Sequence, residues 1–313
     1  MKILNNIVVP TGNILIVEGE RHKSLEFISV GDYGKDINLI REKVVHQELL
    51  PLTEKWVITI STQYGCSMNC TFCDVPGVGK GINATYYDLI NQVLTGLKLH
   101  PDIKHTKRLN IHFARMGEPT WNPNVLEAAK WFHTHLLPEY GVIHPVVSTM
   151  MPKHNIWLKT FIHNWMRIKN RLYNGNAGLQ LSINSTNEKE RAIMFNNNAC
   201  SLLEIAQIME GILAIGRKIT LNFAVANWEI DSEILLKYFN PELYIIKLTP
   251  MHKTKAACEK NIKTELDYTE YYPYQSTNES LQKAGYEVLV FLASKEEDDS
   301  KITCGNAILA NIN

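Results

Sequence analysis

Cys66-Ser-Met-Asn-Cys-Thr-Phe-Cys73 carries three cysteines in the spacing C-x3-C-x2-C, directly behind a strand-like apolar run at residues 56–62. Thiolates are soft ligands that suit iron–sulfur chemistry. Cys66, Cys70 and Cys73 could therefore ligate three irons of a cubane 4Fe–4S cluster. No further cysteine follows until Cys200, so one iron would stay open, as the vacant position of a catalytic metal site does.

Two other interpretations of these cysteines remain at this point, a zinc knuckle and three unrelated thiols. A structural zinc site is a closed tetrahedron and needs a fourth Cys or His ligand at a fixed spacing. The next histidine is His100, which lies beyond a helix-like stretch. The spacing therefore favours the iron–sulfur cluster.

The composition is that of a globular protein. The 313 residues suffice for one large α/β domain, alone or with a small appendage, and 45% are hydrophobic and 20% charged. The formal net charge is zero, so the whole molecule has no electrostatic attraction to nucleic acid. We expect no membrane segment and no signal peptide. Six cysteines are too few for a disulfide scaffold, which predicts a cytoplasmic protein.

Beyond the cysteines, strand-like and helix-like runs alternate, which predicts a parallel sheet of βαβ units. Six strands are expected, at residues 56–62, 109–114, 142–149, 178–183, 218–225 and 243–248. The expected helices lie near 83–99, 123–137, 202–215 and 232–238, with a last helix at 279–284 and strand at 287–292. Residues 1–50 are expected to form a small β-rich extension, with short strands at 7–10, 14–18 and 25–29 and a charged helix or linker at 38–50. Residues 51–313 would then form the core.

Two basic, aromatic stretches have two interpretations each. Residues 140–187 contain no Asp or Glu, and Trp157, Phe161 and Trp165 recur there at helical spacing. They predict either a helix that buries its aromatic stripe or a surface that faces a polyanion. The lysines and tyrosines of residues 252–274 predict either a nucleobase-stacking surface or an ordinary lid.

The C-x3-C-x2-C loop, with Phe72 before its third cysteine, resembles the radical S-adenosylmethionine (SAM) superfamily. The resemblance implies a partial (β/α)6 TIM-like barrel whose active site lies at the carboxyl ends of its strands. It also implies that SAM chelates the open iron and that the reduced cluster cleaves SAM to a 5′-deoxyadenosyl radical. An external electron donor of the flavodoxin or ferredoxin type would reduce the cluster. The segment Met116-Gly-Glu-Pro119 resembles the family's "GGE"-type motif, so Gly117 and Glu118 would bind the amino group of SAM.

Over residues 56–310 the chain is similar to the RlmN/Cfr branch, which methylates adenine in RNA. The matching stretches are residues 61–66, 116–122, 147–149, 181–185, 190–191, 219–223 and 304–306. The resemblance implies that Ser148, Ser182, Asn184 and His252 help to hold SAM. It also implies that Cys304 becomes S-methylated and carries the methylene group to the base. The expected substrate is a nucleic acid or a nucleotide.

The chain departs from this branch at several positions. Thr59 stands where the family has a second reactive cysteine, and a hydroxyl cannot perform thiol–disulfide exchange. Asn184 stands where the family has histidine, and His252 where it has asparagine. Residues 1–50 are too short and too β-like to match the family's helical RNA-binding domain.

These departures leave alternatives. Cys200 or Cys258 could replace the missing thiol, or both could be ordinary packed cysteines. Cys304 could donate a hydrogen atom instead of carrying a methyl group, or be structural. The function predicted first is an RlmN/Cfr-like methyltransferase acting on adenine. The alternatives are a radical SAM enzyme that abstracts hydrogen directly from a nucleotide, small molecule or peptide, and a non-catalytic iron–sulfur electron carrier.

Overall fold

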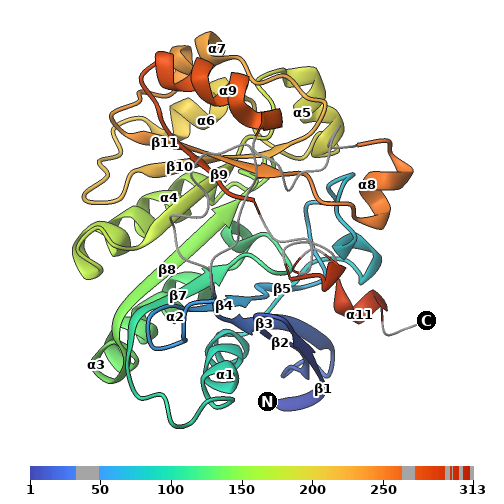
Figure 1. The fold of residues 1–313 in the computed structure, drawn as a ribbon, viewed down its shortest axis with the longest axis vertical. Coiled ribbons are helices and arrows are strands. Elements are labelled where there is room, and N and C mark those ends of the chain that lie inside the picture. Colours follow the sequence, from blue (N-terminus) through green and yellow to red (C-terminus); the bar gives the residue numbers. More distant parts are fainter. Residues whose placement is uncertain (33–48, 263–271, 293–296, 298, 303–305, 311–313) are drawn as a thin grey trace.

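A ten-stranded sheet forms the framework of the computed structural model, in the order β1-β2-β3-β4-β7-β8-β9-β10-β11-β12 (Figure 1). The structure describes residues 1–32, 49–262, 272–292, 297, 299–302 and 306–310. Cys304, residues 33–48 and residues 263–271 lie outside the described residues.

The seven strands from β4 onward are mutually parallel, and the six predicted from the sequence are all among them. They are β4 (Trp56–Ile60), β7 (Thr106–Phe113), β8 (Gly141–Thr149), β9 (Gly178–Ser182), β10 (Ile219–Val225), β11 (Tyr244–Pro250) and β12 (Glu287–Val290). The last strand, which the sequence predicted without a partner, pairs in parallel with β11. The mixed α/β fold with a parallel sheet is therefore confirmed.

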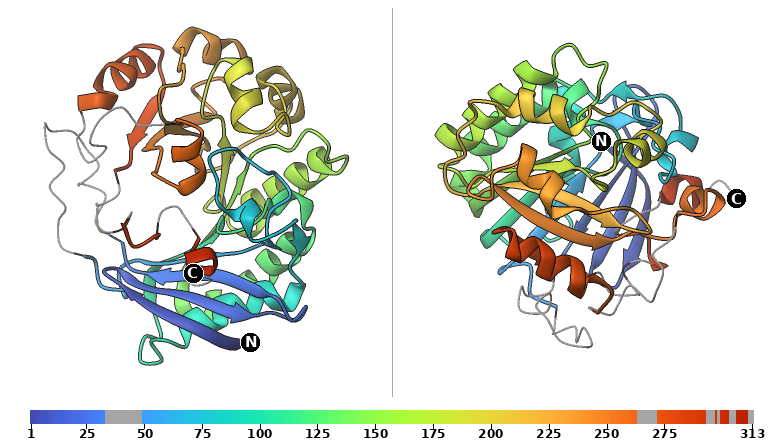
Figure 2. Two further views of the ribbon diagram at one scale, coloured as in Figure 1. Left: turned by 90° about the vertical axis from the view of Figure 1, so that its right-hand side faces the viewer. Right: turned by 90° about the horizontal axis from the view of Figure 1, so that it is seen from above.

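Three antiparallel strands precede this parallel series. They are β1 (Lys2–Val9), β2 (Gly12–Glu18) and β3 (Ser24–Val30). β3 pairs antiparallel with β4, so the N-terminal strands extend the same sheet. Figure 2 shows them as the blue strands at the base of the molecule. The β-rich character expected of residues 1–50 is confirmed for the described part, whereas the expected helix or linker lies almost wholly outside it.

The helices cover one side of the curved sheet, as the view from above in Figure 2 shows. The helices of the barrel are α1 (Tyr86–Leu97), α2 (Asn124–His135), α3 (Leu137–Tyr140), α4 (Leu158–Arg167), α5 (Glu188–Met194), α6 (Leu202–Met209), α7 (Ser232–Tyr238), α8 (Lys255–Glu259) and α9 (Tyr272–Lys283). α1 begins at a capping box, in which Thr85 and Asp88 satisfy each other's backbone N–H groups. The sequence missed α5 and α8, which are short and contain few apolar residues.

Helix α4 packs much of its aromatic stripe into the core. Phe161 and Trp165 are buried, and Trp165 donates its indole N–H to the Gly178 carbonyl at 3.0 Å. Trp157, at the N-cap, is 66% exposed and does not continue the stripe. Lys169 lies in the π-helix that follows (Ile168–Leu172). It is buried, so it does not contribute to a basic surface that could face a polyanion. No helix in the described parts of the chain is long and apolar enough to span a membrane.

Candidate active site at the carboxyl ends of the strands

The three cysteines lie on the loop that follows β5 (Gln63–Tyr64), above the carboxyl end of β4. Cys70 is buried, whereas Cys66 and Cys73 keep part of their surface accessible. Apolar side chains from distant parts of the chain pack around them. These are Met68, Phe72, Met150, Met194, Phe195, Met251, Ala257 and Ile262. The cysteines therefore lie in an apolar environment at the strand ends.

This environment opposes ionisation of the thiols. Burial, followed by the charges of Cys73 and Cys66, raises the pKa of Cys70 well above its usual value. Burial also raises the pKa of Cys66, although the Met68 N–H points at its sulfur at 3.4 Å. Adjacent thiolates that are wholly or partly buried need a compensating cation, which the irons of a cluster would supply. The donor set therefore fits a 4Fe–4S cluster.

Among the described residues, no group of three His, Cys, Asp or Glu side chains is arranged around a single metal-ion position. The cysteine ligands of a cubane each bind a different iron, so the sulfur atoms of the three cysteines need not surround a single metal position.

Two other parts of the barrel hold the cysteine loop in place. Thr71 donates its N–H (2.9 Å) and its hydroxyl (3.1 Å) to the Met194 carbonyl at the end of α5. Thr254, the N-cap of α8, donates its hydroxyl to the Phe72 carbonyl at 2.6 Å. Asp74 accepts the Ala256 N–H from the first turn of α8 at 2.9 Å. Residues of α5 and α8, the helices that follow β9 and β11, thus fix the cysteine loop that follows β5.

Glu118 follows β7 and is 2% exposed. Its Oε1 accepts the Thr120 N–H (3.0 Å), the Thr120 hydroxyl (2.7 Å) and the Thr149 hydroxyl (2.7 Å). Its Oε2 accepts the Met150 N–H at 2.8 Å. Burial raises the pKa of Glu118, while these hydrogen bonds lower it. Oε2, with a single donor among the described residues, keeps the capacity to accept from a bound ammonium group.

Gly117 lets the backbone pass very close to Gln63. Its φ is +94°, and a Cβ there would lie 2.5 Å from the Gln63 Cβ, so a larger residue would not fit. Gln63 Oε1 accepts the N–H groups of Glu118 and Ser67, each at 3.1 Å. One side chain therefore connects the Gly117–Glu118 motif to the cysteine loop.

The remaining predicted SAM contacts lie at the same end of the barrel. Ser148 accepts a hydrogen bond from the Gln180 amide at 2.8 Å, and Ser182 is the last residue of β9. Asn184 has a φ of +61° and accepts the Ala224 N–H at 3.0 Å through Oδ1. His252 follows β11, and its carbonyl accepts the Thr254 N–H at 2.9 Å. Their contact with SAM stays a prediction.

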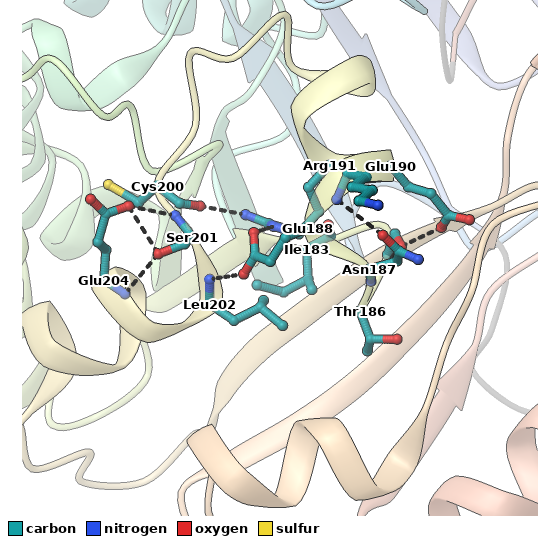
Figure 3. A network of polar contacts seen from close by, with 12 residues as sticks. Ile183, Thr186, Asn187, Glu188, Glu190, Arg191, Cys200, Ser201, Leu202 and Glu204 are labelled. Carbon is teal, nitrogen blue, oxygen red and sulfur yellow. Dashed lines mark hydrogen bonds and ion pairs between the residues drawn. The ribbon is translucent and has the colours of Figure 1, made fainter.

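Cys200 and Cys258 occupy different environments, and Figure 3 shows that of Cys200. The Cys200 carbonyl accepts a hydrogen bond from Arg191 at 2.8 Å, and burial raises the pKa of its thiol to about 11. Such a thiol is a poor nucleophile at neutral pH. Cys258 is exposed on α8, the helix that contacts the cysteine loop. Of the two candidates for the missing thiol, Cys258 has the more suitable environment.

The C-terminal segment on either side of Cys304 is tied to the site. Arg115 donates to the carbonyls of Lys301 (2.8 Å) and Ile302 (3.0 Å) and forms a buried ion pair with Glu26 at 2.5 Å. Glu26 also accepts the N–H groups that begin α11 (Ala307–Ala310), at 2.7 and 3.0 Å. The Asn306 amide lies 3.2 Å from the Met116 sulfur. Both flanks of Cys304 therefore contact the strand end that carries Gly117 and Glu118.

Several of these residues escaped sequence reasoning. Gln63 and Thr149 lie inside stretches that match the RlmN/Cfr branch, and this position within matching stretches could have identified them. No sequence motif identifies Glu26, Arg115 or Thr254, because their partners lie far away along the chain.

No protein-family model matches the sequence. A protein of Pseudothermotoga lettingae described as "Probable dual-specificity RNA methyltransferase RlmN" is 26% identical over 214 residues, which cover 66% of this chain and 58% of that protein. A "Dual-specificity RNA methyltransferase RlmN" of Sulfurimonas denitrificans is 36% identical over 95 residues, covering 30% of this chain and 25% of that protein. The crystal structure of a radical SAM methyltransferase from Sphaerobacter thermophilus shares the fold. Its TM-score is 0.69 at 16% identity, over 96% of this chain and 79% of that one.

The chain shares the fold of a radical SAM methyltransferase and is distantly similar in sequence to RlmN proteins. Its RlmN relatives are distant, and the chain spans less than two thirds of their length. Within the radical SAM fold the cysteine loop, the Gly117–Glu118 motif and the flanks of Cys304 lie at one end of the barrel.

Proposed function

We propose that this radical SAM protein is a methyltransferase that modifies an adenine base. Cys66, Cys70 and Cys73 would hold a 4Fe–4S cluster, and Cys304 would carry the methyl group. SAM would be bound at the strand ends by Gly117, Glu118, Ser148, Ser182, Asn184 and His252. An external flavodoxin- or ferredoxin-type protein would supply the electron. The relatives' descriptions as RNA methyltransferases support the reaction type.

The observation that carries this proposal is the attachment of the C-terminal segment beside the SAM motif. Cys304 is two residues from Ile302 and two from Asn306 in the sequence. Arg115 binds the Ile302 carbonyl, and Asn306 contacts Met116. The described residues on both flanks of Cys304 are thus held beside the strand end that carries Glu118, which supports a role for Cys304 in the reaction.

The bound cluster and SAM supply the one-electron chemistry and the methyl group. The chain's own residues would orient SAM and the substrate and would exclude water. Glu118 Oε2 would accept a hydrogen bond from the SAM ammonium group, since three donors already bind Oε1. The apolar residues around the cysteines would keep water from the cluster.

Thr59 favours a second candidate function. It is half-buried on β4, next to His112 of β7, and it offers a hydroxyl where the RlmN/Cfr branch has a thiol. Without that thiol the enzyme could abstract hydrogen directly from its substrate instead of methylating it.

Two measurements test the proposal. Cluster-reconstituted protein, supplied with dithionite and SAM without oxygen, should form 5′-deoxyadenosine, and a complete lack of it would exclude both functions. Mass spectrometry of the C-terminal peptide should find Cys304 methylated in the wild type and unmodified in Cys304→Ala. An unmodified Cys304 in active wild-type protein would favour the second function. Cys258→Ala, in the same assay, shows whether that exposed thiol takes part.

A further inference from the structure

The inner face of the barrel is accessible. In β11, and in β10 as far as Ala224, buried residues alternate with half-buried ones. The buried set faces the helices, as Phe113 of β7 does when it packs on Phe132 of α2 and Trp165 of α4. The half-buried set therefore faces the interior. Parallel strands covered on both sides are normally buried throughout, so the alternation marks an interior that the chain leaves partly open.

Many residues of this inner face are polar, with Val57 and Ile245 as apolar exceptions, whereas barrels of this type usually fill their interior with branched apolar side chains. The inward, half-buried positions include Thr59, Arg108, His112, Ser148, Gln180, Thr220, Asn222, Lys247 and Thr249. Four cations act together on His112. Burial first, and then the charges of Lys247, Arg217, Lys55 and Arg108, lower its pKa to about 3.

Among the described residues, these cations lack matching negative charge. Asp32 supplies the negative charge that acts on Arg108 and Lys247, and it already forms an ion pair with Lys55. The other partners in the described part of the chain are neutral. Arg108 donates to the Asn110 amide oxygen, Arg217 donates to a backbone carbonyl, and Lys247 lies 4.9 Å from the centre of the Phe291 ring. Burial lowers the pKa of all three, that of Lys247 to about 8. Partly buried, unpaired cations of this kind lower the free energy of unfolding until an anion binds between them.

We propose that the barrel interior binds a small phosphate-bearing substrate, with its phosphate held by Lys247, Arg108 and Arg217. The substrate class is a mononucleotide rather than RNA. The inference rests on the proposed function in one respect, because the base would be the end of the nucleotide that faces SAM.

Size and charge favour this class. Lys247 lies three residues before Pro250, the end of β11, which puts it about 10 Å below the strand end at 3.3 Å per residue. That span suits the separation of phosphate and base in one nucleotide. A polynucleotide would have to bring its backbone into the barrel to reach the same cations. Arginine and lysine together suit a doubly charged phosphate.

Isothermal titration calorimetry on the full, cluster-reconstituted chain tests the proposal without turnover. AMP should bind at least about tenfold more tightly than adenosine, because only AMP carries the phosphate. Lys247→Met should weaken AMP binding at least about tenfold and leave adenosine binding unchanged. Arg108→Gln should weaken AMP binding in the same way. The matched control is Lys130→Met, which removes an exposed lysine from α2.

Lys247→Met should also fold, because methionine has a similar shape and carries no charge to desolvate. Its melting temperature without ligand should equal or exceed that of the wild type. Equal affinities for AMP and adenosine, or unchanged AMP affinity in both variants, would overturn the proposal. Tighter binding of a short RNA hairpin than of AMP would replace the mononucleotide by RNA. AMP binding as expected, without 5′-deoxyadenosine on reduction, would contradict the proposed function and leave the phosphate site intact.

Discussion

Single residues of the site show where sequence reasoning reaches its limit. The matching strand end pointed to Ser148, which faces the barrel interior toward Gln180. Its neighbour Thr149 points to the opposite side of the strand and donates to Glu118. A sequence motif identifies such a pair but does not say which member contacts which partner, because alternate side chains point to opposite faces of a strand. The three cysteines were predictable, because their spacing alone carries the chemistry.

His112 provides a prediction about pH. Burial and the nearby cations Lys247, Arg217, Lys55 and Arg108 keep it neutral in the folded state, whereas in the unfolded chain it binds a proton below about pH 6.5. The unfolded state then binds more protons than the folded one. The free energy of unfolding should therefore fall as the pH drops below about 6.5, by up to about 1.4 kcal/mol per pH unit from this residue.

Urea unfolding at pH 7.5, 6 and 5 measures this effect. His112→Gln should flatten the pH dependence over that interval and leave the free energy of unfolding at pH 7.5 little changed. His154→Gln, on the surface, should keep the wild-type slope. Identical slopes in all three proteins would mean that His112 is protonated in the folded state.

At the scale of elements, the barrel strands could be predicted to within a few residues because their apolar runs are long and regular. The sequence did not predict how β3 and β12 join the sheet. β3 pairs with a strand that begins 26 residues later in the chain, and such non-local pairing leaves no local pattern. The short helices α5 and α8 were missed, although their ends hold the cysteine loop.

The Thr254 cap should be important for retention of the cluster. Thr254→Val removes the N-cap of α8 and its hydrogen bond to Phe72, so the cysteine loop should loosen. Loss of the cap should cost about 1 kcal/mol of unfolding free energy. Decay of the visible absorbance of the cluster in air should become severalfold faster. Asp231→Ala removes the N-cap of α7, whose carboxylate accepts only from Glu233 and Ile234 among the described residues. It should cost similar stability and leave the decay rate unchanged; equal rates in both variants would contradict a role for α8.

The buried Glu26–Arg115 pair should be important for the C-terminal segment. Arg115→Met removes the donors to the Lys301 and Ile302 carbonyls and leaves Glu26 buried without its partner, at a cost of about 3–5 kcal/mol. Hydrogen exchange at residues 306–310 should rise and methylation of Cys304 should fall. The iron content and 5′-deoxyadenosine formation of the folded protein should persist.

The control for this variant is Lys130→Met, which breaks an exposed ion pair on α2 and should change neither readout. Normal Cys304 methylation in folded Arg115→Met protein would show that the pair only stabilises the fold.

In the molecule as a whole, the apolar surroundings of the cysteines and the basic residues of the interior lie at different depths along the barrel axis. The cysteines lie at the carboxyl ends of the strands, and the basic residues lie below them. The zero net charge of the sequence conceals this arrangement, because a sum over residues does not record which charges the fold gathers. The fold class followed from the alternation of elements, whereas the basic interior depends on which strands become neighbours.

The central claim is that three cysteines leave one iron of a cubane open to SAM. Electron paramagnetic resonance of the reduced, anaerobically reconstituted protein tests it most directly. We predict the signal of a reduced 4Fe–4S cluster that changes when SAM is added, that is lost in Cys66→Ala, Cys70→Ala and Cys73→Ala, and that persists in Cys258→Ala. A protein that binds zinc instead of iron, or a cluster whose signal is unaffected by SAM, would contradict the account.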